Sequence, residues 1–219
     1  MRGLPSTVFP ILDSSVISEA RPGADRKVFL DQLGRSLADA GVRLMEYRNK
    51  TGTDAEVLAD ARVLRAAMPD VTLIMDDRVD VALAACFDGV HVDAGDLPPT
   101  EARLLMGVEA TIGTSASSEA QLREAIKSGA DYIAFGPVFP TTTKQTSVAP
   151  IGLDGVTRFR ELAGMGPVLV AAAGITLETA SQVLAAGADV VAVSAALFRH
   201  HDPAAEYCRW MKVLEHAAN

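Results

Sequence analysis

Eight short apolar runs recur along the chain, and an amphipathic stretch with helical periodicity separates each run from the next. Short apolar runs bounded by turn residues are typical of strands that are buried on both faces of a parallel sheet. Their alternation with helices predicts an α/β fold. The predicted strands are Val8–Leu12, Arg43–Tyr47, Thr72–Met75, Gly89–Val92, Ala110–Gly113, Tyr132–Phe135, Val168–Ala172 and Val190–Val193. The predicted helices lie near residues 27–40, 54–67, 79–86, 99–106, 118–128, 154–163, 177–186 and 203–216.

The junctions between helices and strands form a weak internal repeat. Gln121–Phe135 reads QLREAIKSGADYIAF and Gln182–Val193 reads QVLAAGADVVAV, so both segments pass from a helix through Gly-Ala-Asp into an apolar run. Glycine at a helix end directly before a buried strand is typical of the αβ turn in a parallel sheet. Eight such strands without interruption favour a closed (β/α)8 TIM barrel. An open doubly wound sheet is the alternative, but no Gly-rich fingerprint follows the first run.

Composition excludes several classes of protein. The 219 residues contain no Pro/Gly/Ser-rich linker, which predicts one domain over residues 1–219. The net charge of −8 disfavours nucleic-acid binding. No apolar run approaches the ~18 residues of a membrane span, and a proline interrupts the apolar N-terminal segment, which makes it a poor signal peptide. Cys86 and Cys208 form no disulfide framework, so we expect a reduced, cytoplasmic protein.

Charged residues at the end of the second predicted strand indicate an anion site. In a barrel, the carboxyl ends of the strands and the loops after them form the active site. Strand alternation directs Glu46, Arg48 and Lys50 to one face, so two cations are expected at the barrel mouth. A solvent-exposed charge cluster is the alternative interpretation.

Acidic residues follow the third and fourth predicted strands. Asp76 and Asp77 follow the third, and Asp96 lies in the loop after the fourth. Acids on neighbouring loops repel one another unless a cation compensates, and Mg²⁺ prefers oxygen ligands. We therefore predict that Asp77 and Asp96 bind Mg²⁺, the alternative being first-turn carboxylates that stabilise helices. His91, inside the fourth run, is interpreted as barrel packing.

Hydroxyl-rich segments follow the fifth and sixth predicted strands. Ser115 lies one turn before the next helix, where a ligand could meet its hydroxyl. The loop that begins at Gly136 runs for about fifteen residues, and loops of that length in compact domains are usually functional. It contains Thr141, Thr143 and Lys144, a composition typical of anion binding.

The last two predicted strands end in small residues. Gly174 would let backbone N–H groups approach a ligand closely, and Val193-Ser194 precedes what is predicted to be a short extra helix. Tight packing of small residues is the alternative. Together the residues indicate two anion subsites and a metal, without a Ser/His/Asp set or a Cys/His metal motif. A reaction that needs electrostatic stabilisation and little proton transfer fits this inventory.

In this order the motifs resemble the thiamine phosphate synthase family over roughly residues 8 to 200. The resemblance rests on successive matches along the chain. These are Arg48-x-Lys50, Asp77, Gly89–Val92 followed by Asp96, Ser115, Gly136–Lys144, Gly174-Ile175 and Val193-Ser194.

The resemblance implies a transferase that joins 4-amino-5-hydroxymethyl-2-methylpyrimidine diphosphate to 4-methyl-5-(2-hydroxyethyl)thiazole phosphate, with Mg²⁺ as cofactor. It implies that Arg48, Lys50, Ser115, Lys144 and the metal neutralise the departing pyrophosphate. It further implies substrate contacts at Glu46, Asp76, Thr141, Thr143, Gly174, Val193 and Ser194. A homodimer is left open.

Two positions depart from the family pattern. Glu46 stands where the family has Gln, and Asp76 stands where it has Asn. Glu46 can still accept a hydrogen bond from a pyrimidine amino group but cannot donate one. Two other functions remain alternatives: a thiazole tautomerase, whose catalytic His position is Ser117 here, and an inactive thiamine phosphate-binding protein.

Overall fold

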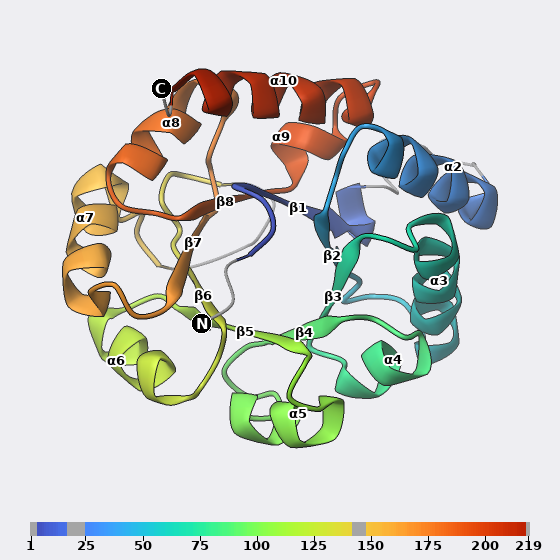
Figure 1. Cartoon of the computed structure of the whole chain (residues 1–219), viewed down its shortest axis with the longest axis horizontal. Helices are drawn as coiled ribbons and strands as arrows, with labels where there is room; N and C mark the ends of the chain where they lie inside the picture. Colours follow the sequence, from blue (N-terminus) through green and yellow to red (C-terminus); the bar gives the residue numbers. More distant parts are fainter. Residues whose placement is uncertain (1–3, 17–24, 142–147, 218–219) are drawn as a thin grey trace.

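The computed structural model describes residues 4–16, 25–141 and 148–217, and its eight parallel strands close into a barrel surrounded by helices (Figure 1). Each strand pairs with the next along the chain, and the first pairs with the last. The predicted TIM barrel is therefore confirmed, and the open sheet is excluded. The strands are β1 Val8–Asp13, β2 Leu44–Arg48, β3 Thr72–Asp76, β4 Gly89–Val92, β5 Thr111–Ala116, β6 Tyr132–Phe135, β7 Val168–Ala172 and β8 Val190–Val193.

The helices lie close to the predicted ranges and form the outer ring in Figure 1. Thr53 caps the helix Asp54–Ala67 in a reciprocal capping box with Glu56, as the spacing of these two residues in the sequence indicates. The short extra helix after β8 is also present. The helices are α2 Arg26–Asp39, α3 Asp54–Ala67, α4 Val79–Ala84, α5 Pro99–Met106, α6 Glu119–Lys127, α7 Gly152–Ala163, α8 Leu177–Ala185, α9 Ala195–Phe198 and α10 Pro203–Ala217.

The fifth strand is longer than predicted. It was expected to end at Gly113, with Ser115 in the following loop, but it continues to Ala116. Residues Thr114, Ser115 and Ala116 pair with Ile133 to Phe135 of β6. Their small polar side chains look like a loop in sequence, whereas the ladder to β6 holds them extended. Ser115 is therefore fixed by the barrel wall itself.

Apolar side chains fill the barrel interior. Phe9, Leu44, Ile74, Tyr132 and Val170 are buried there, with the rings of Phe9 and Tyr132 in edge-to-face contact at 5.7 Å. A larger apolar cluster packs between the strands and the helices. No helix in the described part of the chain is long and apolar enough to cross a membrane.

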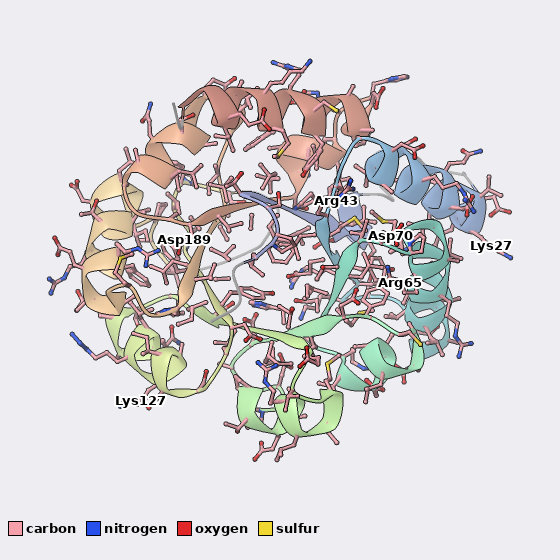
Figure 2. The ribbon with its side chains drawn as sticks, in the orientation of Figure 1. Lys27, Arg43, Arg65, Asp70, Lys127 and Asp189 are labelled. Carbon is pink, nitrogen blue, oxygen red and sulfur yellow. The ribbon has the colours of Figure 1, made fainter. Side chains whose placement is uncertain are left out.

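An Arg–Asp clamp recurs at the amino ends of the strands, opposite the predicted site. Asp131, the last residue of a Gly-Ala-Asp junction, accepts hydrogen bonds from Ile112 N at 2.8 Å and from the Arg103 guanidinium at 2.6 Å. The same contacts recur at two other junctions. Asp88 accepts from Leu73 N and from Arg65. Asp189 accepts from Leu169 N and from Arg160. Figure 2 labels Arg65 and Asp189 of these clamps. The repeat seen in the sequence is thus the repeat of a strand-anchoring carboxylate.

Candidate active site

A cavity of about 340 Å³ opens at the carboxyl ends of the strands, and most strands contribute a polar residue to its lining. A second hollow of about 300 Å³ adjoins it and shares Asp93, Ser115 and Thr141 with it. The apolar residues Phe9, Tyr132 and Val170 also line the first cavity, where they separate it from the barrel interior. The predicted position of the site is therefore where the structure has its cavity.

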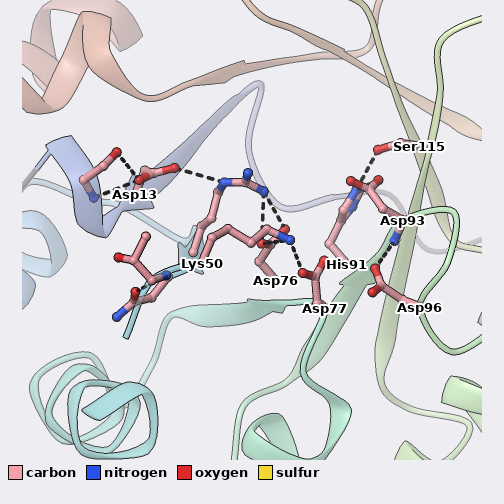
Figure 3. A network of polar contacts seen from close by, with 12 residues as sticks. Asp13, Lys50, Asp76, Asp77, His91, Asp93, Asp96 and Ser115 are labelled. Atoms are coloured by element: carbon pink, nitrogen blue, oxygen red, sulfur yellow. Dashed lines mark hydrogen bonds and ion pairs between the residues drawn. The ribbon is translucent and has the colours of Figure 1, made fainter. Parts of the chain in front are cut away.

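The predicted cations lie together and are already paired with acids. Arg48 Nε lies 2.9 Å from Asp13 Oδ2, and Arg48 Nη1 lies 3.0 Å from Asp76 Oδ2. Lys50 Nζ lies 3.0 Å from the same Asp76 oxygen and also forms an ion pair with Asp77. Figure 3 shows this chain of ion pairs running from Asp13 through Asp76 to Asp77. Sequence analysis missed Asp13, although its place at the end of the first strand was the available signal.

Glu46 lies in the cavity wall and is only 4% exposed. Burial raises the pKa of Glu46 to about 7. The charge of Asp76 raises this pKa further, whereas the charge of His91 lowers it. The carboxyl group is therefore partly protonated near neutral pH, and in that form it donates one hydrogen bond as well as accepting others. The expectation that Glu46 cannot donate holds only for its ionised form.

The two predicted metal ligands flank β4. Asp77 has a left-handed backbone with φ 62°, and its N–H donates to the carbonyl of His91 at 2.8 Å. Asp77 Oδ1 is buried without a hydrogen-bond partner in the described part of the chain. Asp96 Oδ2 accepts from the backbone N–H of Asp93 at 2.8 Å. Within residues 4–16, 25–141 and 148–217, no group of three or more His, Cys, Asp or Glu could hold a metal.

His91 is packed in the barrel wall against Tyr132, as interpreted, and it also lines the cavity, which the sequence did not indicate. It is 6% exposed, lines the cavity, and places Nε2 at 2.8 Å from Ser115 Oγ and Nδ1 at 3.0 Å from Tyr132 Oη. Burial opposes its charged form, but the hydrogen bond to Asp93 and the Glu46 charge outweigh burial and raise the pKa of His91. In sequence, alternation within a barrel strand does not distinguish an inward core residue from an inward site residue.

Gly174, Ser194 and Thr141 line the cavity on the side of β7 and β8. Gly174 has φ +72°, and a Cβ there would lie 2.5 Å from the carbonyl oxygen of Phe139, so only glycine fits. Ser194 Oγ is buried and has no hydrogen-bond partner among the described residues. Both features are consistent with a ligand contact at this side.

Lys50, Asp77, Asp96 and Val193 are not among the residues that line the two hollows. The Val193 side chain packs in the outer core, so only its backbone could meet a ligand. Thr143 and Lys144 lie outside the described residues.

Arg48, several acids and several hydroxyls line a cavity at the carboxyl ends of the barrel strands, which is where (β/α)8 barrel enzymes bind their substrates. A sequence model described as thiamine monophosphate synthase matches residues 16–197 of this chain. The chain belongs to the thiamine monophosphate synthase family, as the resemblance of its motifs indicated.

Individual relatives agree with this assignment. The chain is 42% identical over 186 residues to the thiamine-phosphate synthase of Koribacter versatilis, covering 84% of this chain and 86% of that one. It is 40% identical over 176 residues to the thiamine-phosphate synthase of Agrobacterium fabrum, covering 78% and 80%. Among solved structures, the thiamine phosphate pyrophosphorylase from Pyrococcus furiosus superposes with a TM-score of 0.80 at 28% identity, covering 97% of this chain and 98% of that one.

Proposed function

We propose that the protein joins a pyrimidine diphosphate to a thiazole phosphate and releases thiamine phosphate and pyrophosphate. The observation that carries this proposal is the position of Arg48 in a cavity whose other side offers the Gly174 backbone and the Ser194 hydroxyl, which has no hydrogen-bond partner among the described residues. Lys50 lies beside Arg48, and both pair with Asp76. Two separated subsites can bind two anionic substrates, whereas a single cluster of cations would bind only one.

The reaction requires charge stabilisation more than proton transfer. The C–O bond of the pyrimidine methylene breaks and its electron pair leaves with pyrophosphate. The thiazole nitrogen then forms the new C–N bond with its own lone pair, so no general base is needed. Arg48 and Lys50 stabilise the departing charge, and Ser115 donates a hydrogen bond to it. Both cations are paired with acids, so a bound diphosphate must compete with Asp76 and Asp77 for them.

Mg²⁺ fits the acids on this side of the cavity. Asp77 and Asp96 would hold it, since Asp77 Oδ1 is buried and without a hydrogen-bond partner in the described ranges. Two carboxylates suffice when phosphate oxygens of a substrate complete the coordination, because Mg²⁺ commonly binds in that way. Bound there, Mg²⁺ would supply positive charge to the leaving pyrophosphate.

The thiazole phosphate would lie on the side of β7 and β8. Gly174 allows close approach of the backbone, and Ser194 Oγ and Thr141 offer hydroxyl groups. Thr143 and Lys144 stay predictions from the sequence: Thr143 as a substrate contact and Lys144 as a cation for the leaving group. A cytoplasmic location and a homodimer also stay predictions.

A product assay tests the proposal. The protein is incubated with both substrates, with and without Mg²⁺, and thiamine phosphate and pyrophosphate are measured together. Equal amounts of the two products that depend on Mg²⁺ support the synthase. Conversion of a thiazole tautomer without pyrophosphate release would identify the isomerase, and binding of thiamine phosphate without turnover would identify the inactive binder.

A further inference from the structure

Three neighbouring strands place a continuous hydrogen-bonded chain beside the cavity. Tyr132 of β6 contacts His91 of β4 at Nδ1, 3.0 Å away, and His91 Nε2 contacts Ser115 of β5 at 2.8 Å. The rings of His91 and Tyr132 stack at a centroid distance of 5.5 Å. Figure 3 shows the last contact of this chain, from His91 to Ser115. His91, Ser115 and Tyr132 all line the cavity, and the Tyr132 side chain is fully buried at its base.

The pairing of Ser115 with His91 superficially resembles the nucleophile and base of a hydrolase. In that arrangement the carboxylate contacts the ring nitrogen that faces away from the serine, and the other nitrogen stays free to take the serine proton. Here Asp93 Oδ1 lies 3.5 Å from Nε2, the same nitrogen that faces Ser115. The opposite nitrogen faces a phenol instead. The geometry therefore does not make His91 a base for Ser115.

The position of each proton follows from what Tyr132 can do. Burial and the Glu46 charge raise the pKa of Tyr132 well above its ordinary value, so its hydroxyl keeps its proton. His91 Nδ1 is the one hydrogen-bond partner of that hydroxyl among the described residues. When the imidazole is neutral, Tyr132 donates to Nδ1 and the ring proton is therefore on Nε2. When the imidazole is charged, Nε2 carries a proton as well.

The backbone beside Tyr132 fixes the phenol in place. A Cβ at position 113 would lie 2.0 Å from Tyr132 Cζ, so the ring lies directly against Gly113. Phe9 contacts the ring edge on another side. Because its surroundings leave the ring little freedom, the hydroxyl stays directed at His91.

We propose that Tyr132 and His91 are positioning residues that make Ser115 a hydrogen-bond donor to an anionic oxygen of the bound substrate. Tyr132 donates to Nδ1, Nε2–H donates to Ser115 Oγ, and the Ser115 proton is left to point into the cavity. The donor direction is a property of this chain alone. Its anionic acceptor, the leaving diphosphate, rests on the proposed function.

Nitrogen-15 NMR of the histidine-labelled protein tests the proton positions without any substrate. The chain has four histidines, and His91→Asn identifies the signals of His91 by their loss. A ring with its proton on Nε2 alone supports the proposal. A proton on Nδ1 would overturn it, because Tyr132 would then accept from His91 rather than donate to it.

A double-mutant cycle tests the effect on the reaction. Tyr132→Phe keeps the packed ring and removes the donor, so its single-turnover rate should fall about tenfold, the equivalent of one lost hydrogen bond. In a Ser115→Ala background the same change should cost little, because its effect passes through Ser115. Equal losses in both backgrounds would show that Tyr132 acts through structure alone and would contradict the proposal.

Tyr207→Phe is the matched control. Tyr207 is also buried, contacts Ser6 Oγ at 3.4 Å and lies in α10, outside the cavity lining. It should change neither the His91 spectrum nor the rate. If the NMR result holds but no thiamine phosphate forms, the proposed function fails and the donor chain stands. If thiamine phosphate forms but Nε2 is unprotonated, the donor chain fails and the proposed function stands.

Discussion

Arg48 Nε lies 2.9 Å from Asp13 Oδ2, so the guanidinium proposed to bind diphosphate is held from behind by a carboxylate. Asp13 Oδ1 in turn accepts from the backbone N–H of Ser15 at 2.9 Å, which fixes the carboxylate at the end of β1. Holding Nε leaves the two terminal nitrogens of Arg48 for Asp76 or for a phosphate. Orientation of the cation is thus built into the first strand.

We expect Asp13→Ala to raise the KM for the pyrimidine diphosphate about tenfold, because Arg48 then loses a charge-assisted hydrogen bond that orients it. Asp13→Asn, which keeps one acceptor oxygen, should recover part of the loss. Steady-state kinetics with varied pyrimidine substrate measures both effects. Asp31→Ala is the control, since Asp31 also pairs with an arginine, Arg35, but on the exposed face of α2. Equal KM values for Asp13→Ala and the control would contradict the positioning role.

The clamp at the amino ends of the strands should affect stability without affecting activity. Asp131→Ala removes the acceptor for Ile112 N and for Arg103, which leaves two donors without that partner. The free energy of unfolding should fall by roughly 1–3 kcal/mol. Denaturant titration measures this loss, while turnover at low temperature should stay unchanged because the clamp lies at the other end of the barrel.

Glu124→Ala provides the comparison for that prediction. Glu124 pairs with Lys127 at 2.8 Å on the exposed surface of α6, and such pairs contribute ~0–1 kcal/mol. A stability loss at Asp131 no larger than that at Glu124 would show that the clamp is not a strand anchor.

The fold was accessible from the sequence because the αβ junctions carry a strong local signal. Gly129, Ala130 and Asp131 end a helix, turn the chain and anchor the next strand, and the same residues recur before β8. The limits of β5 were less accessible. Ser115 belongs to a small polar segment whose extended form depends on pairing with β6, a contact that no local pattern records.

The site was accessible in part. Arg48 and Lys50 were found because charges at the end of an apolar run stand out in a sequence. The cavity contacts of His91 were missed because they depend on which residues of β5 and β6 lie beside it. The protonation of Glu46 was also hidden, because the pKa of a carboxyl follows from its burial rather than from its neighbours in sequence.

Glu46 should make substrate binding depend on pH. Its pKa is raised to about 7, so below that pH the carboxyl is neutral and above it a negative charge develops near the diphosphate site. We expect kcat/KM for the pyrimidine substrate to fall as pH rises through 7. Glu46→Gln should remove this step and lower the KM at pH 8 with little change in kcat. His91, Asp76, Asp93 and Arg48 also face Glu46, and a pH profile of the variant that matches the wild type would show that Glu46 is not the group responsible for the step.

The same group should make stability depend on pH. A carboxyl whose pKa is higher in the folded than in the unfolded state binds more protons when folded, so stability falls as pH rises from about 4.5 to about 7. The cost of the buried charge is fully present above that window and absent below it. Glu46→Gln should therefore raise the melting temperature more at pH 8 than at pH 4.5. An equal gain at both values would contradict the raised pKa.

Asp77 should couple metal binding to the release of Lys50. Lys50 is paired with Asp77, and a metal cation on Asp77 would compete for the same carboxylate. We expect Asp77→Ala to lower turnover by more than about a hundredfold, and to weaken Mg²⁺ binding in the presence of pyrophosphate, measured by calorimetry. Asp80→Ala is the control, because Asp80 is an exposed acid that pairs with Arg78 at 2.7 Å in α4. Synthesis at the wild-type rate in excess EDTA would refute the metal role. If the reaction needs Mg²⁺ but the Asp77→Ala variant binds Mg²⁺ as tightly as the wild type, the metal ligand is another acid.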